Sequence, residues 1–212
     1  MQTFTDAEIQ KNCPHCDPHS LALKRLLQET SRFWIVGDAY PITKGHILII
    51  PKKHISCVGE YDKETYNEFT SLYEKTSLFL QQTYGSVSTF EHGKIGQTVF
   101  HAHTHLLPFV GSSHDIVPEG KDFLRRIDDL MQMQYEFKRS GMYLFFSIDQ
   151  DKWLVDTNIG KPRFFRDRFA KALGRPERGN WKEMHSNPVL MAQAEEDIHD
   201  LLKKWRKYEE KK

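Results

Sequence analysis

The chain has 212 residues, long enough for one compact domain with an extension. Its 30 lysines and arginines balance 29 aspartates and glutamates to a formal net charge of +1, so no global positive field favours a nucleic-acid partner. No apolar run approaches the ~18 residues that span a bilayer, and the start MQTFTDAEIQK lacks the layout of a signal peptide. The odd count of three cysteines fits a reducing compartment. These features predict a cytoplasmic protein with no membrane or specific nucleic-acid partner.

The first half of the chain alternates short apolar segments with turn signals. The patterns predict a helix over 20–30, strands over 32–38 and 45–54, a helix over 61–84, and strands over 87–93 and 97–109. Pro and Gly mark the loop between the first two strands, and Gly85 ends the long helical pattern. Strands on both sides of one long helix predict a compact α+β unit.

The composition changes past about Gly111. The patterns there predict a charged helix over 121–138, strands over 141–149 and 152–157, an Arg-rich amphipathic helix over 163–174 and a closing helix over 190–208. We expect a domain over 1–112 and a mixed extension over 113–212 that packs on it. The arginines of the amphipathic helix are candidates for contacts with phosphates or bases, but a solvated face is the favoured interpretation. They are Arg163, Arg166 and Arg168.

Three histidines occupy every second position of the segment HAHTHLLP: His101, His103 and His105. In a strand these side chains share one face, and the residues between them face the other way, towards the predicted long helix. Those residues are Phe100, Ala102, Thr104 and Leu106. Three imidazoles fill an apolar core poorly because each ring has a donor and an acceptor to satisfy. Three interpretations remain: a surface strand without chemistry, a metal site, or nucleophilic and acid-base histidines acting on phosphorus.

The segment HAHTHLLP resembles the H-φ-H-φ-H-φ-φ signature of the histidine-triad (HIT) superfamily, where φ is apolar and Thr104 is a departure. GQTV directly before it and GHILIIPKKH some fifty residues earlier also resemble segments of that family, in the same order. The resemblance covers about residues 13–110. It implies an antiparallel sheet with a long helix, and a homodimer with that helix and a strand at the interface.

The resemblance also implies a nucleotidyl-histidine mechanism. His103 attacks the α-phosphorus of a nucleotide, and water then releases the nucleoside monophosphate. Neutral imidazole is nucleophilic near pH 7, which fits this role. His105 is the expected phosphate contact and transition-state donor, and His46 is the expected fourth histidine that sets protonation in the cluster. His101 completes the catalytic triad.

Nucleotide contacts are implied for three further residues. Gln97 and Thr98 offer uncharged donors to the phosphate. Asp38, eight residues before His46, is expected to accept the ribose hydroxyls, with an ordinary turn residue as the alternative. The place where related hydrolases carry an Asn or Gln near the phosphates is held by Phe90, with Glu91 or His92 as substitutes.

The segment NCPHC contains a CxxC pair, Cys13 and Cys16, which alone indicates a redox pair, a zinc site or neither. A structural Zn²⁺ needs four N or S ligands, so two more residues must converge on the pair. Resemblance to zinc-bearing HIT proteins implies that these are His54 and His101. His15, inside the CxxC segment, is expected to be exposed.

The resemblance implies a hydrolase that acts at the α-phosphate of nucleoside phosphoramidates or dinucleoside polyphosphates, with adenine or another purine as base. One alternative is a nucleotidyltransferase or phosphorylase, in which phosphate or a sugar phosphate accepts the nucleotide from His103. Another is a regulatory protein that binds nucleotides without turnover. The presence of His103 argues against the last.

Overall fold

The structure is a computed structural model that describes residue 10 and residues 12–211. The start of the predicted domain and nearly all of the segment MQTFTDAEIQK lie outside these residues. Among the described residues, no helix is both long and apolar enough to cross a bilayer.

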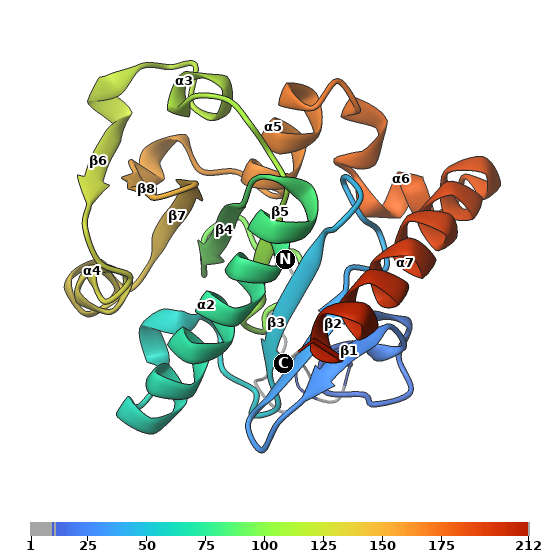
Figure 1. The fold of residues 1–212 in the computed structure, drawn as a ribbon. Helices are drawn as coiled ribbons and strands as arrows, with labels where there is room; N and C mark the ends of the chain where they lie inside the picture. Colours follow the sequence, from blue (N-terminus) through green and yellow to red (C-terminus); the bar gives the residue numbers. More distant parts are fainter. Residues whose placement is uncertain (1–9, 11, 212) are drawn as a thin grey trace.

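One eight-stranded antiparallel sheet organises the fold, in the order β1-β2-β3-β5-β4-β7-β8-β6 (Figure 1). Its strands are β1 Leu26–Glu29, β2 Phe33–Gly37, β3 Ile47–Pro51, β4 Ser88–Gly93, β5 Thr104–Leu107, β6 Leu124–Ile127, β7 Tyr143–Ile148 and β8 Asp151–Val155. The α-helices are α2 Lys63–Tyr84, α3 Ser113–Ile116, α4 Gln132–Ser140, α5 Phe164–Ala172, α6 Trp181–His185 and α7 Pro188–Glu209. Short 3₁₀ turns are η1 Leu21–Leu23, η2 Val58–Glu60, η3 Lys121–Phe123, η4 Thr157–Ile159 and η5 Pro176–Arg178. The α+β class and the long helix are confirmed.

The two long helices α2 and α7 lie on the same face of strands β1, β2, β3 and β5 (Figure 1). Their apolar stripes meet alternate residues of these strands, such as Ile35 and Ile49, in one fully buried core. Trp205 of α7 packs edge-on against Phe79 of α2 at 4.8 Å between ring centroids. The closing helix therefore completes the core of the first half of the chain.

The opposite face of the sheet carries a second core, built with α5. Phe90 of β4 stacks on Phe169 of α5, with ring centroids 5.2 Å apart. Leu107 of β5 and Phe146 of β7 belong to the same cluster. Because successive strand residues alternate between faces, this second face is also the one that carries His105.

The sheet runs without a break from the first half of the chain into the second. β4 pairs with β5 on one side and with all six residues of β7 on the other. β4 is therefore an interior strand, and β1 and β6 are the edges. The domain boundary after residue 112 and the homodimer stay predictions. Because β4 pairs with a strand on each side, a second chain cannot add a strand to it.

The predicted helix over 20–30 is wrong throughout, and the predicted helix over 121–138 is wrong in its N-terminal half. Residues 20–30 form η1 and then the edge strand β1, because Leu26–Glu29 pair with β2. Residues 121–127 form η3 and β6, which pairs with β8, and the helix begins only at Gln132. In both places the ladder hydrogen bonds to a neighbouring strand outweigh a weak local helical pattern. The remaining predicted helices and strands are present, with shifted ends.

The predicted strand over 97–109 is much shorter in the structure, because β5 begins at Thr104. His101 and His103 therefore lie in the connecting segment before the strand, and strict alternation applies only from Thr104 onward. Ala102 and Leu106 are fully buried in the core beneath α2, as expected. Phe100 is 54% exposed, so its predicted packing on the long helix is wrong.

We expect Gly85→Ala to destabilise the protein by about 1 kcal/mol. Gly85 ends α2 in the left-handed conformation, with φ 84°, and no heavy atom lies within 4 Å of the place where a Cβ would stand. The cost is thus confined to the backbone. Urea denaturation measures it, and Gly85→Asn is the matched control because Asn tolerates this conformation better than Ala. Equal losses in the two variants would contradict this account.

Candidate active site

Three of the predicted histidines, His46, His103 and His105, come together on the sheet face opposite α2. His46 lies directly before β3, and His105 lies on β5 opposite Leu48 of β3. The His105 ring stacks on Phe90 of β4 at 4.1 Å, and the His103 ring meets it edge-on at 5.0 Å. Figure 1 shows these strands side by side in the middle of the sheet. His46, His103 and His105 thus form one cluster, and His101 contacts it through its main-chain carbonyl.

Backbone groups fix the tautomers of His46 and His105. The Ile42 N–H donates to His46 Nδ1 at 3.1 Å, so that nitrogen carries a lone pair. His46 Nε2 therefore holds the proton and donates it to His105 Nδ1 at 2.9 Å. The proton of His105 is consequently on Nε2, which is buried and has no hydrogen-bond partner among the described residues. The pair presents one free N–H donor beside His103.

The tautomer of His103 follows from the same logic. Its Nδ1 lies 2.6 Å from the His101 carbonyl oxygen, which can only accept, so Nδ1 carries the proton and Nε2 the lone pair. Burial lowers the pKa of His103, and the hydrogen bond to the His101 carbonyl partly opposes this shift. Burial also lowers the pKa of His46 to about 4 and that of His105 well below its usual value. At neutral pH all three rings are uncharged.

Asp38 lies beside this cluster and is 4% exposed. Its Oδ1 accepts from the Tyr40 N–H at 2.8 Å, and its Oδ2 accepts from Arg166 Nη1 of α5 at 2.7 Å. Burial alone raises the pKa of Asp38, but the Arg166 guanidinium and the hydrogen bond from the Tyr40 N–H hold it below its usual value. The solvated face expected for Arg166 is wrong, because its side chain is buried against this carboxylate.

The two residues predicted to contact phosphate differ in exposure. Gln97 is buried and donates from Nε2 to the Ser56 carbonyl at 2.6 Å, while its Oε1 has no partner among the described residues. Thr98 is exposed, and its Oγ1 accepts from the Trp181 indole N–H of α6 at 3.1 Å. The Thr98 hydroxyl proton remains available as a donor.

Phe90, Glu91 and His92 point in alternate directions from β4. Phe90 covers His105, and His92 accepts from the Phe165 N–H at 3.1 Å, so both face the histidine cluster and α5. Glu91 points to the other side, where it accepts hydrogen bonds from the Val58 N–H and the Tyr143 hydroxyl. Glu91 is therefore too far around the strand to replace an amide near the phosphates.

We expect Glu91→Gln to flatten the pH dependence of stability between about pH 4.5 and 7. Burial raises the pKa of Glu91 to about 7 from the ordinary 4.5. The folded state therefore holds this proton more tightly than the unfolded chain. The contribution of this proton to the free energy of unfolding is complete below pH 4.5 and is lost as the pH rises through about 7, a difference of roughly 3 kcal/mol. Urea denaturation across this window measures it, with exposed Glu195→Gln as control. Equal slopes for wild type and Glu91→Gln would exclude this role.

The four predicted zinc ligands converge. Cys13 and Cys16 Sγ each lie 3.4 Å from His101 Nδ1, and Cys16 Sγ lies 3.2 Å from His54 Nδ1. All four ligand atoms lie within 4.8 Å of one another. Tetrahedral zinc with bonds of about 2.0–2.3 Å requires ligand atoms separated by roughly 3.5 Å. His101 donates from Nε2 to the Pro51 carbonyl at 2.7 Å, which leaves the lone pair on Nδ1, towards the cysteines.

The Cys16 thiol lacks the lowered pKa of a redox CxxC motif. Burial and the neighbouring Cys13 raise the pKa of the Cys16 thiol to about 12. Redox CxxC motifs lower the thiol pKa to form a nucleophilic thiolate, so this environment disfavours that alternative. The geometry and the donor set are compatible with zinc.

His15 departs from its expected exposure. It is 4% exposed, and its ring meets that of His103 edge-on at 4.9 Å and that of His101 at 5.5 Å. Its Nδ1 has no hydrogen-bond partner among the described residues. The sequence contains a signal for the burial of His15. It lies between Cys13 and Cys16, and a loop that carries two metal ligands has to lie close to the other two ligands, His54 and His101.

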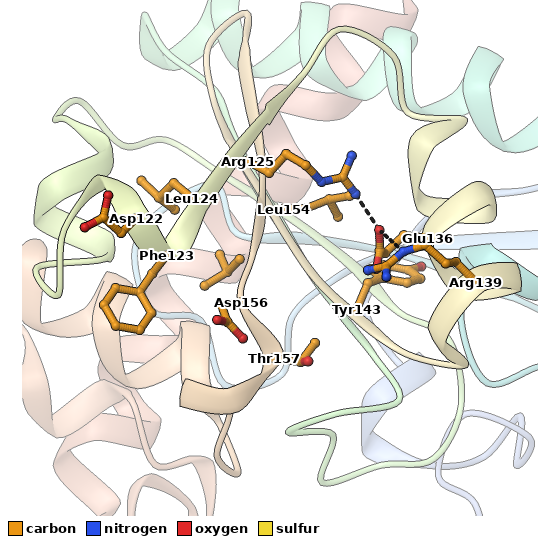
Figure 2. A pocket seen from close by; sticks show the side chains of 11 residues that line it. Asp122, Phe123, Leu124, Arg125, Glu136, Arg139, Tyr143, Leu154, Asp156 and Thr157 are labelled. Carbon is orange, nitrogen blue, oxygen red and sulfur yellow. Dashed lines mark hydrogen bonds and ion pairs between the residues drawn. The ribbon is translucent and has the colours of Figure 1, made fainter.

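A cavity of about 310 Å³ lies elsewhere, between β6, β8 and α4 (Figure 2). Arg125 and Arg139 both reach Glu136 at its rim. None of the predicted site residues lines this cavity. Its arginines are already paired with one carboxylate, so we assign it no role in the chemistry.

Comparison with known proteins identifies the first half of the chain. Residues 22–110 match the family model described as HIT domain. An uncharacterized 16.1 kDa HIT-like protein of Mycoplasma pneumoniae is 37% identical over 75 residues, 34% of this chain and 52% of that protein. The protein named hit of Bacillus subtilis is 33% identical over 78 residues, 35% of this chain and 54% of that protein. The chain thus spans about half the length of these curated relatives.

A similar solved structure is that of a hypothetical histidine triad nucleotide-binding protein from Sulfolobus tokodaii, at 30% identity and a TM-score of 0.41. The similarity covers 47% of this chain and 70% of that one. The family match covers every predicted site residue except Cys13 and Cys16. Residues 22–110 of this chain therefore form a domain of the histidine-triad (HIT) superfamily.

Proposed function

We propose that this protein is a nucleotide hydrolase that forms a nucleotidyl-histidine on His103. Its substrates are nucleoside phosphoramidates or dinucleoside polyphosphates with a purine base, cleaved at the α-phosphate. The observation that carries the proposal is the hydrogen bond from His103 Nδ1–H to the His101 carbonyl, which leaves the Nε2 lone pair free on a half-buried, neutral ring. A neutral imidazole with a free nitrogen lone pair is a nucleophile near pH 7.

The neighbouring groups fit the two steps of this reaction. In the first step His103 Nε2 bonds to the α-phosphorus, and the bond to the leaving group breaks with its electron pair on that group. The free His105 N–H donates to a phosphate oxygen as negative charge builds, and the His101 carbonyl stabilises the charged His103 ring through Nδ1–H. In the second step water attacks the phosphorus and loses a proton to solvent. The N–P bond breaks and the nucleoside monophosphate leaves.

The Thr98 hydroxyl and the Gln97 side chain, which lie in the segment just before the triad, are the proposed phosphate contacts. The ribose contact of Asp38 stays a prediction and is not part of the proposal. Both of its oxygens already have protein partners, and Arg166 would have to release one of them.

We further propose that Cys13, Cys16, His54 and His101 hold a structural Zn²⁺. The ion would supply no chemistry to the phosphate. It would tie the N-terminal segment to the residues around the cluster, and its ligand His101 also provides the carbonyl that orients His103.

The test is incubation with adenosine phosphoramidate and with a dinucleoside tetraphosphate, each labelled at the α-phosphate, followed by rapid denaturation in alkali, which preserves N–P bonds. We expect label on the protein and release of the monophosphate. Faster turnover with inorganic phosphate, and a nucleoside diphosphate as product, would replace the hydrolase with the transferase. Binding of adenosine monophosphate without any label would support the regulatory alternative.

A further inference from the structure

The Arg166 side chain joins the C-terminal half of the chain to the histidine cluster. It is 6% exposed, and it donates to Asp38 Oδ2 at 2.7 Å, to the Tyr40 carbonyl at 2.6 Å and to the Gly179 carbonyl at 3.3 Å. With all three nitrogens engaged, the guanidinium has a single orientation. It is the one guanidinium that contacts Asp38 among the described residues.

Several contacts fix the helix that carries Arg166. The Arg163 N–H at its start donates to the Gly96 carbonyl at 2.9 Å, and the Phe165 N–H donates to His92 Nε2 at 3.1 Å. Phe169 stacks on Phe90, which in turn stacks on His105. α5 is therefore packed directly on the strands that carry the cluster, and Arg166 is held in register with Asp38.

Asp38 Oδ2 and His46 Nδ1 lie next to each other, and both are hydrogen-bond acceptors. Asp38 Oδ2 lies 3.4 Å from His46 Nδ1, which already accepts the Ile42 N–H and so carries no proton. A carboxylate next to a ring nitrogen normally draws a proton onto that nitrogen. Here the Arg166 guanidinium neutralises the carboxylate and supplies its hydrogen bond, so His46 is free to keep its proton on Nε2.

We propose that Arg166 is a positioning residue that sets the tautomers of His46 and His105, and through them the N–H donor of the reaction site. The inference rests on the proposed function for its catalytic consequence only. Without Arg166, Asp38 is a buried carboxylate lacking its charged partner. Stranding such a charge costs more than losing the single Ile42 hydrogen bond. The proton of His46 then moves from Nε2 to Nδ1 and bonds to Asp38.

This shift passes to His105 without any proton being gained or lost. His46 Nε2 becomes an acceptor, so His105 must donate to it from Nδ1, and the proton leaves His105 Nε2. The nitrogen beside His103 then presents a lone pair where the phosphate oxygen needs a donor. His103 itself is unchanged, because its tautomer depends on the His101 carbonyl.

The test compares Arg166→Met with the double variant Asp38→Asn/Arg166→Met, which removes both charges, and with Arg166→Lys, which keeps the positive charge. The ¹⁵N chemical shifts of the imidazole nitrogens are measured on the full chain without substrate. We expect the proton of His105 on Nε2 in the wild type, on Nδ1 in Arg166→Met, and again on Nε2 in the other two variants. The asparagine cannot draw a proton from His46, so the double variant stays folded and retains the wild-type tautomers.

Kinetics with adenosine phosphoramidate give a second readout. We expect kcat of Arg166→Met to fall on the order of 100-fold, the cost of one transition-state donor, with KM changed only a few-fold and kcat recovered in Arg166→Lys. An unchanged His105 tautomer in folded Arg166→Met, or a shifted tautomer in the double variant, overturns the proposal. If Arg166→Met does not fold, the double variant and Arg166→Lys still decide, and loss of the wild-type tautomer in either counts against it. A wild type that never forms the labelled histidine defeats the proposed function, whereas the ¹⁵N shifts still test the tautomers.

Discussion

His103→Asn is expected to abolish the labelled intermediate and to lower the rate of phosphoramidate hydrolysis on the order of 10³-fold or more. Asparagine is close in size and can still donate to the His101 carbonyl, but its amide nitrogen has no nucleophilic lone pair. The fold should survive, because the ring is half-buried and makes no apolar core contact that the amide lacks. Quenched-flow measurement of label and product, with thermal unfolding as a fold check, tests this.

Two matched variants separate chemistry from packing. His199→Asn makes the same change on an exposed residue of α7 and should leave the rate unchanged. His105→Asn keeps the nucleophile but removes the N–H donor, so the label should still form, roughly 100-fold more slowly. Label on His103→Asn at the wild-type rate would place the nucleophile elsewhere.

Strong periodicity explains which elements could be predicted. α2 has an apolar stripe, an Asp62 cap that accepts from the Thr65 N–H, and Gly85 at its end, so every local signal agrees with the helix. β3 and β7 are continuous apolar runs that the sheet buries on both faces. In these segments the local preference and the tertiary contacts demand the same conformation.

The two helix errors arise where the local signals are weak. Residues 26–29 and 124–127 each have only four residues in a strand, and both are edge strands of the sheet. Their conformation is decided by pairing with β2 and β8, partners that only the tertiary fold supplies. The hydrophobic periodicity of one sequence does not show which strands pair, so it cannot predict these two edge strands.

For the site, the resemblance to the HIT superfamily supplied the residues, and the structure supplied the reason they act together. Of the three triad histidines, only His105 lies on a strand, and His103 lies in the segment before it. The alternation of side chains in a strand therefore explains the position of His105 alone. The protonation of His103 is determined by a main-chain carbonyl, and that of His46 by a main-chain N–H. Hydrogen bonds to main-chain groups do not depend on the type of the partner residue, so the protonation of these histidines could not be predicted from the sequence.

Arg166 could not be found from the sequence for a related reason. It lies 128 residues from Asp38, on a helix whose arginines resemble an ordinary solvated face. Arg168 also pairs with a carboxylate, Glu119, but Arg166 is the more buried of the two and reaches Asp38. The extension therefore contacts the candidate active site, which the family match over residues 22–110 alone does not include.

Cys16→Ser is expected to weaken zinc binding on the order of 100-fold or more and to lower stability by roughly 3 kcal/mol in saturating zinc. Serine is a far poorer zinc ligand than a thiolate, and a metal that binds only the folded state stabilises it by mass action. The wild type should carry one zinc ion per chain, and a chelator should lower its melting temperature by about 6 °C or more. Metal analysis and thermal unfolding in chelator and in zinc measure both effects.

Cys57→Ser is the matched control, because Cys57 is fully buried but lies outside the ligand cluster. It should lose stability through burial of a hydroxyl while keeping its zinc, so metal content and stability separate in the two variants. Since His101, a proposed zinc ligand, also provides the carbonyl that contacts His103, Cys16→Ser should lose some activity as well, but far less than His103→Asn. Equal zinc affinity in wild type and Cys16→Ser would remove the metal site, while leaving the nucleophile untouched, because the tautomer of His103 depends on a carbonyl and not on the ion.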